Sequence, residues 1–402
     1  MTQKNSNKKV IKLKGLINED KDFLKNIVKE ALQEILEGEM DEALGAGKSV
    51  RNQERLGYRS GYYTRNFNTR VGKIELRIPQ DRNGLFSTEI FERYSRSEKA
   101  LVSSIMEMYV NGVSTRKVKK ITEELCGTKF SAGTVSNINK NLDAKLKKFA
   151  ERKLDESFPY LFLDATYKKV REDGIVRSQA IFTALGVTWE GRRQILAVEL
   201  SNRETKTTWK EFILKLKKRG LHGVEFVVSD NHEGLKKSVF ETLPSAIWQR
   251  CYVHFLRNAL SHLPRKKVID DVLQELRWIY DRSNMKDARI ALNQWLDKWH
   301  KKYPRLCDWV DENIEETLAF YRLPKQHHKN MKSSNVLERI HEEFKRRTYV
   351  VRIFPNKESC LRLIRAVAVE VQEFWIERSR YINMDFYKEF KKTNNKTNKK
   401  VA

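Results

Sequence analysis

Two aspartates directly follow apolar, strand-like stretches and are the first candidates for chemistry. Asp164 comes after the apolar run in YLFLDATYKKV (residues 160–170), and Asp230 ends VEFVVSD (residues 224–230). A carboxylate this close to a core carries a large desolvation cost unless it is paired or holds a metal. Taken singly, each aspartate is also explained as a cap of the loop or helix that follows it. If the two strands are neighbours, both carboxylates point at one place.

Two carboxylates at one place predict a hard divalent cation. They repel each other, and Mg²⁺ removes the repulsion while taking phosphate oxygens as further ligands. Two such ions about 4 Å apart would hold the attacking and leaving oxygens of a phosphodiester. Asp164 and Asp230 therefore predict Mg²⁺-dependent phosphoryl transfer, with Mn²⁺ as an alternative ion.

A third acid is expected at such a site, and Glu338 is the candidate. It lies in Asn335-Val336-Leu337-Glu338, at the start of a helix-like stretch (residues 333–347). The same spacing is that of a helix capping box, so the residues alone leave ligand and cap open. Four cations follow Glu338 in a region where phosphate would lie: Arg339, Lys345, Arg346 and Arg347.

Cys251 and His254 form a C-x-x-H pair. A zinc site would need two more ligands, and the remaining Cys and His residues lack convincing spacing. The pair could also be core residues at a strand end. A further alternative places His254 with Arg250 and Arg257 near the acids, in contact with phosphate.

Strand patterns begin at residue 158 and predict a mixed α/β sheet with helices on its faces. Three strands in a meander are followed by helix, strand, helix and strand, the last over residues 246–255. Residues 256–331 have only helical periodicity, and helices are expected again at 333–347 and 357–380. The sheet domain is therefore expected to be interrupted by an all-helical insertion.

The N-terminal part predicts DNA contacts of two kinds. After a helix within 21–44, Arg and Tyr alternate along residues 51–82, which suits phosphate contacts and stacking but equally a plain surface hairpin. Residues 101–147 predict three helices that resemble a helix-turn-helix, with an ordinary helical hairpin as the alternative. The residues predicted here to contact DNA are Arg59, Arg65, Thr134, Asn137 and Lys140.

Composition favours a polyanionic partner. The chain of 402 residues has 79 Lys and Arg against 53 Asp and Glu, a net charge of +26. Such an excess is typical of nucleic-acid binding, because each phosphate contact releases a condensed counterion. Four scattered cysteines fit a reducing cytoplasm, and no apolar run predicts a signal peptide or a membrane span.

Five blocks in order resemble the bacterial Mutator-type insertion-sequence transposases. They are LDATYKKVR (163–171), GLHGVEFVVSDNHEGLKKS (220–238), WQRCYVHFLRN (248–258), SSNVLERIHEEFKRRT (333–348) and VVRIFPN (350–356). The resemblance covers about residues 38–380. Its spacing also agrees, with 230 − 164 = 66 and 338 − 230 = 108 residues between the acids.

The resemblance implies a ribonuclease-H-like catalytic core with a DDE triad at Asp164, Asp230 and Glu338, which would hold two Mg²⁺ ions. It also makes Cys251 and His254 the C/H signature of the family. His341 departs from the pattern, where Asn is more usual, and is expected behind the ligands. Implied partners are transposon terminal inverted repeats and target DNA, with the protein at least dimeric in the end complex and on the bacterial nucleoid when bound.

These expectations divide the chain into seven parts. They are basic tails at 1–20 and 391–402, a helix and hairpin region at 21–100, a helix-turn-helix-like domain at 101–150, a catalytic domain at 158–255 and 333–350, a helical insertion at 256–332, and a C-terminal helical region at 351–390. Two rival functions remain: a catalytically silent DNA-binding regulator descended from a transposase, and a metal-dependent nuclease without strand transfer.

Overall fold

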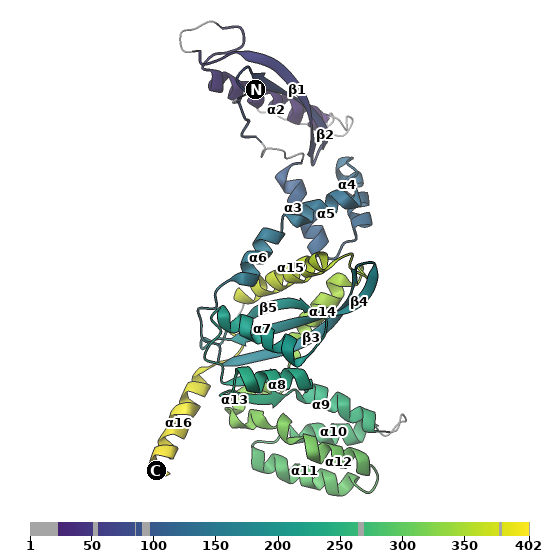
Figure 1. Cartoon of the computed structure of the whole chain (residues 1–402), viewed down its shortest axis with the longest axis vertical. Coiled ribbons are helices and arrows are strands. Elements are labelled where there is room, and N and C mark those ends of the chain that lie inside the picture. The colour runs from purple at the N-terminus through teal and green to yellow at the C-terminus, as the bar shows by residue number, and fades with distance from the viewer. Residues whose placement is uncertain are drawn as a thin grey trace, which may run out of the picture. The chain divides into compact units, whose positions relative to one another are not determined.

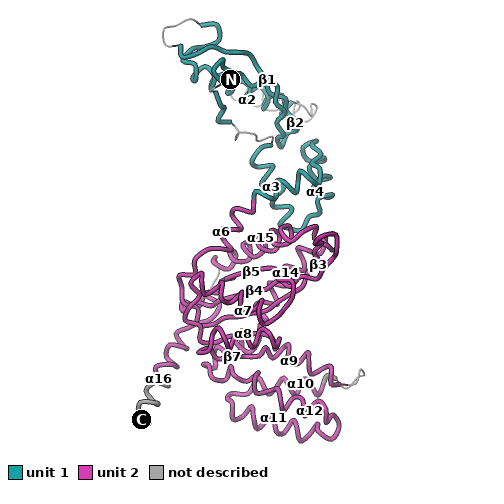
Figure 2. The backbone as a smooth tube through the Cα atoms, viewed as in Figure 1, with its two compact units in different colours: residues 1–141 teal, residues 142–402 magenta. Residues whose placement is uncertain are grey.

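The computed structural model describes residues 23–50, 55–84, 86–90, 97–263, 269–377 and 380–401. The chain separates into two compact units, residues 1–141 and residues 142–402 (Figure 2). Of the expected basic tails, residues 1–20 lie outside the described part. None of the described helices is both long and apolar enough to cross a membrane.

Unit 1 begins with a helix packed on a two-stranded hairpin. Helix α2 (Phe23–Leu44) covers strands β1 (Arg59–Thr69) and β2 (Gly72–Asp81), which pair antiparallel. The apolar positions of β2 alternate, so one face of the hairpin is buried against α2. The shared core comprises Leu36, Phe67, Ile74, Leu76 and Ile78.

Three helices complete unit 1: α3 (Lys99–Val110), α4 (Thr115–Cys126) and α5 (Ala132–Lys140). Ser114 and Ser131 are N-caps whose side chains accept backbone N–H groups, as their positions in the sequence predict. Helical spacing in the sequence puts Leu125 on the apolar face with Val118 and Ile121, but Leu125 is 77% exposed. The same counting puts Asn139 on the outer face of a helix that starts at Ser131 and runs to about residue 147, but Asn139 is buried. That stretch also forms two helices, α5 and a second one over residues 143–151.

Unit 2 is built on a mixed sheet, of which Figure 1 labels β3, β4 and β5. The sheet has five strands in the order β5-β4-β3-β6-β7. Its strands are β3 (Tyr160–Glu172), β4 (Ile175–Val187), β5 (Arg193–Ser201), β6 (Phe226–Ser229) and β7 (Ile247–Arg250). Strands β3, β4 and β5 form an antiparallel meander, whereas β6 runs parallel to β3 and β7 parallel to β6. The predicted mixed α/β order is confirmed, but the last strand, expected over residues 246–255, ends at Arg250, and residues 252–255 are helical.

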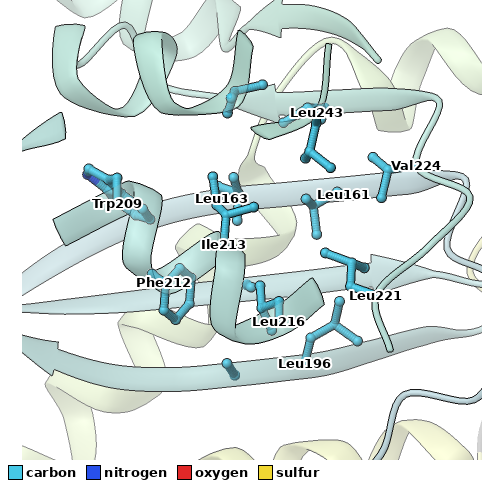
Figure 3. Close-up of a cluster of buried hydrophobic side chains, with 14 of the residues drawn as sticks. Leu161, Leu163, Leu196, Trp209, Phe212, Ile213, Leu216, Leu221, Val224 and Leu243 are labelled. Atoms are coloured by element: carbon cyan, nitrogen blue, oxygen red, sulfur yellow. The ribbon is translucent and has the colours of Figure 1, made fainter. Parts of the chain in front are cut away.

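Helices cover both faces of this sheet. Helices α7 (Lys206–Lys218) and α8 (Glu233–Thr242) pack on the face that carries Leu161 and Leu163, forming a continuous apolar cluster (Figure 3). Side chains alternate along a strand, so Asp164 belongs to the opposite face. Helix α14 (Asn335–Thr348) contacts that opposite face.

The remainder of unit 2 is helical. After β7 come α9 (Tyr252–Ala259), α10 (Ile269–Ile279), α11 (Met285–Trp299), α12 (Pro304–Asn313) and α13 (Lys325–Met331), with short 3₁₀ turns at 260–262, 315–317 and 319–322. Helix α6 (Asp143–Glu151) precedes the sheet, and α15 (Lys357–Ile376) follows α14. Residues 391–402 were expected to form a tail, but α16 (Asp385–Val401) carries helix to residue 401.

Candidate active site

Asp164 lies within a strand rather than at the end of one. Strand β3 continues for eight residues beyond it, to Glu172. The strand that ends beside Asp164 is its neighbour β6, because the last pair between β3 and β6 is Leu163 with Ser229. Asp164 and Asp230 are therefore the residues that directly follow this last pair, so the condition that their strands be neighbours is met. Asp164 is 8% exposed.

Glu338 comes to the same place from the first turn of α14. The capping box that its spacing allowed is not formed, because Ser334 is the N-cap and its side chain makes no capping hydrogen bond. The Glu338 carboxylate instead lies 3.6 Å from His254 Nε2 and 3.4 Å from an Arg257 guanidinium nitrogen. Its side chain is directed at the acid site.

His254 stands between the acids. Its Nδ1 lies 3.9 Å from Asp230 Oδ1, opposite the contact of Nε2 with Glu338. Burial lowers the pKa of His254. The hydrogen bond and charge of Cys251 and the carboxylates of Asp230 and Asp164 outweigh burial and raise this pKa to about 9. The imidazolium thus offsets part of the negative charge that the acids bring together.

Cys251 contacts His254 from the preceding turn of the chain. It is fully buried at the N-cap of α9, one turn before His254, and its sulfur accepts the Ser334 N–H at 3.3 Å. Burial raises the pKa of the Cys251 thiol, but hydrogen bonding with His254 and Ser334 outweighs this and lowers it. Cys251 therefore ties the start of α9 to the start of α14.

Asp164 lies near two carboxylates and two histidines, which act on it in different ways. Burial raises its pKa to about 7; the Asp230 and Glu338 carboxylates add to the rise and His254 opposes it. His341 Nδ1 lies 3.6 Å from Asp164 Oδ2, and its Nε2 is 3.1 Å from the Thr183 hydroxyl. Burial lowers the pKa of His341 to about 3, so this ring is neutral and orients the carboxylate without neutralising it.

The donor set fits a hard divalent cation in chemical type. The charges of Asp230 and Glu338 both act on Asp164, and this is the repulsion that Mg²⁺ would relieve. Among the described residues, no group of three or more His, Cys, Asp or Glu side chains is placed so that it could hold a metal ion without rearrangement. Asp230 and Glu338 keep 40% and 29% of their side chains exposed, which leaves both carboxylates room to turn.

The cations predicted to contact DNA near this site fall into two groups. Arg257, Arg339, Lys345 and Arg346 are exposed, although Arg346 is paired with Glu343. Arg250 and Arg347 are buried. The Arg250 guanidinium lies over the rings of Phe255 and Trp309, and Arg347 pairs with Glu370. These two side chains are turned into the protein, so their positions do not support the predicted phosphate contacts.

The residues of unit 1 that were predicted to contact DNA also fall into an exposed group and a less exposed group. Thr134, Asn137 and Lys140 are all exposed on α5, as a reading helix requires. The Arg59 guanidinium is engaged by Glu37 and Asp41 of α2, and Arg65 is half-buried. The hairpin arginines therefore lie less open than the alternation of Arg and Tyr predicted.

Two residues near the acids were missed from the sequence. Thr183 on β4 is the register partner of Asp164 and is fully buried, a polar residue inside an apolar run, IFTALGV. Lys168 shares the face of Asp164 on β3 and is half-buried. Period-two counting from Asp164 would have found Lys168, but cross-strand register is not visible in one sequence.

Comparison with known proteins identifies the family. The profile of the transposases of the Mutator family matches residues 1–378. The chain is 62% identical over 380 residues to the transposase for insertion sequence element ISRM5 of Rhizobium meliloti, covering 94% of this chain and 95% of that one.

More distant relatives agree along nearly the whole chain. The transposase for IS256 in transposon Tn4001 of Staphylococcus aureus is 40% identical over 368 residues, covering 90% of this chain and 94% of that one. The transposase for IS1081 of Mycobacterium tuberculosis is 37% identical over 367 residues, covering 90% and 88%. The chain therefore belongs to the Mutator family of transposases.

Proposed function

We propose that this transposase cleaves DNA at the ends of an insertion sequence and joins the freed 3′-OH ends to target DNA, using Asp164, Asp230 and Glu338. The observation that carries the proposal is that Asp230, directly after β6, and Glu338 on α14 both contact His254, while Asp164 on β3 follows the last residue paired with β6. In this assignment the sheet of unit 2 is a ribonuclease-H-like core, and the helices after β7 are an insertion in it.

Mg²⁺ bound by the three carboxylates would activate the attacking oxygen and stabilise the charge of the phosphodiester transition state. The chain's own groups prepare that site. Thr183 and His341 fix the orientation of Asp164, and His254 holds Asp230 and Glu338 toward the same point. Arg257, exposed beside Glu338, supplies positive charge where the scissile phosphate enters.

Recognition of the terminal repeats is assigned to unit 1. Helices α4 and α5, joined by a five-residue turn, would act as a helix-turn-helix, with the exposed side of α5 in the major groove. Joining two transposon ends requires two active sites, so the working complex is a dimer or a larger assembly with both ends bound.

The decisive test is Asp164→Ala in the full chain. End cleavage and joining in Mg²⁺ should fall by roughly 10³-fold or more, since several kcal/mol of transition-state stabilisation are lost at 1.36 kcal/mol per factor of ten. Binding of terminal-repeat DNA should stay within a factor of two or so. Joining by Asp164→Ala at the wild-type rate would refute the site.

A matched pair on α14 tests the third acid. Glu338→Gln should lose joining as completely as the Asp164 variant, whereas Glu342→Gln, one turn further along the helix and exposed, should not. Labelled end DNA incubated with plasmid and Mg²⁺ also separates the rival functions. Nicked product alone would indicate a nuclease, and binding alone a silent regulator.

A further inference from the structure

The edge of β3 that faces β6 is open beside the acid site. Strand β6 pairs with β3 only up to Leu163. Pairing on that edge resumes at Val170, which forms a bridge with Phe354, while the other edge of β3 is paired throughout with β4. Within the described part of the chain, residues 164–168 therefore border the site with one edge that pairs with no other strand.

Helix α14 runs along this open edge in the direction of β3. Midway along the helix His341 contacts Asp164, and beyond its end the chain reaches Phe354 at Val170. Tyr349, the C-cap of the helix, lies eleven residues after Glu338. At 1.5 Å per residue it is about 16 Å from Glu338 along the axis, roughly the rise of five base pairs.

Two lysines lie between these ends. Lys168 is half-buried on the face of β3 that carries Asp164, and burial together with the nearby Lys345 of α14 lowers its pKa. Across the described residues, neither ammonium group has an ion-pair partner. Two neighbouring cations, one of them partly withdrawn from water, cost free energy unless an anion joins them.

The far end of α14 presents exposed aromatic and aliphatic side chains. Tyr349 is 81% exposed, and Val350 and Ile353 are 48% and 41% exposed. Arg352 is exposed among them. A strip of apolar side chains set in positive charge suits nucleic acid, because bases stack on aromatic rings and phosphates bind the cations.

We propose that the strip between α14 and the open edge of β3 binds the DNA strand that leaves the acid site, with Lys168 and Lys345 on its phosphates and Tyr349 stacked on an unpaired base. The inference rests on the proposed function for DNA as the substrate. It adds a place where the duplex end is opened, within about five base pairs of the cleaved bond.

DNA fits this strip better than a protein partner does. The cations outnumber the acids along it, and Glu343 and Glu172 are already paired, with Arg346 and Lys357 respectively. The strip also begins at the carboxylates that would bind the scissile phosphate. A protein interface of the same patch would bury Lys168 and Lys345 together without a counter-charge.

Base stacking is tested with 2-aminopurine placed in turn at each of the first eight positions of end DNA, bound to the full chain without divalent metal. One position should change its fluorescence on binding by wild-type protein and by Tyr349→Phe. Tyr349→Ala should abolish that change and bind pre-opened end DNA roughly tenfold more weakly, as expected for one lost stacking contact. Trp278→Ala, which removes an exposed ring from α10, is the matched control.

Phosphate binding is tested by salt dependence. Lys168→Gln with Lys345→Gln should make the slope of log affinity against log salt shallower by about 1.4 to 1.8, the value for two lost phosphate contacts. Lys301→Gln, exposed elsewhere in unit 2, should leave the slope unchanged.

Two outcomes would overturn the strip: no position that depends on Tyr349, or a Tyr349→Ala variant that changes only the oligomeric state measured by light scattering. Both assays read binding rather than turnover. A failure of the DDE assignment would appear as joining by Asp164→Ala, and so is distinguishable from a failure of the strip.

Discussion

The acid site of unit 2 and the outer face of α5 in unit 1 use polar residues in opposite ways. Around Asp164, charged and polar groups are buried and contact one another, so each changes the titration of the next. On α5, Thr134, Asn137 and Lys140 stand exposed on a short helix fixed by its N-cap and a small core. Chemistry requires groups whose orientation is imposed, whereas recognition requires groups that are free to meet a partner.

The difference has an energetic consequence. A carboxylate buried among other carboxylates is a cost to folding that a bound cation or a proton can offset, while exposed side chains on a helix cost almost nothing. The two regions should therefore respond differently to pH, to metal and to substitution.

The largest expected effect on stability is at Asp164. Its pKa is raised from 3.8 to about 7, so the folded state binds the proton more tightly than the unfolded state. That contribution is fully present below about pH 4 and is lost as pH rises through 7, by roughly 4 kcal/mol at most at 1.36 kcal/mol per unit. Asp164→Asn removes the buried charge and should unfold at higher denaturant than wild type at pH 8, but not at pH 4.

Tryptophan fluorescence is a suitable probe, because all eight tryptophans, from Trp189 to Trp375, lie in unit 2. Asp155→Asn, an exposed carboxylate of the same unit, should show no such pH-dependent gain. Added Mg²⁺ should stabilise wild type and not Asp164→Asn. Equal pH profiles for wild type and Asp164→Asn would mean that Asp164 is not held as a buried acid.

Two helical glycines, one in each unit, differ in how much space a Cβ atom would have. A Cβ on Gly234 of α8 would lie 2.6 Å from the Lys206 backbone nitrogen and 2.8 Å from the Thr205 carbonyl carbon, where α7 begins. Gly234→Ala should therefore lower the free energy of unfolding of unit 2 by about 1–3 kcal/mol, measured by tryptophan fluorescence.

Gly38 of α2 is the matched control in unit 1. A Cβ there meets nothing within 4 Å, and its backbone is helical. Gly38→Ala should stabilise the helix by about 0.5–1 kcal/mol and leave the tryptophan transition in place. Equal effects of the two substitutions would contradict the close approach of α7 and α8.

Sequence patterns pointed to the proposed site because its residues lie in strongly patterned elements. Asp164 and Asp230 follow apolar runs that could only be buried strands, and order and spacing with the family blocks added Glu338. Regular alternation and helical period likewise predicted the succession of strands and helices along unit 2, since local pattern and burial agree there.

What the sequence missed depends on contacts between distant segments. The partnership of Thr183 with Asp164 follows from the register of β4, and the burial of Arg250 follows from Trp309, 59 residues later on α12. Leu125 and Asn139 were misplaced because α4 and α5 are short, so a difference of one residue in helix phase is enough to exchange buried and exposed positions.

The smallest expected effects belong to α5, where single contacts are exposed and independent. Lys140→Ala should weaken binding of all DNA sequences alike and make the salt slope shallower by about 0.9. Asn137→Ala should weaken terminal-repeat DNA by about tenfold and random DNA hardly at all, since a base-edge contact carries roughly 1–3 kcal/mol of discrimination. Lys120→Gln, exposed on α4, is the control for charge alone.

The contrast with the acid site lies in what these variants preserve. Both α5 variants should unfold like wild type at pH 4 and at pH 8, because neither side chain is buried. At saturating DNA they should also join ends at the wild-type rate. Titration by fluorescence anisotropy, followed by single-turnover joining, separates the two readouts; a joining defect that persists at saturation would place α5 in the chemistry rather than in recognition.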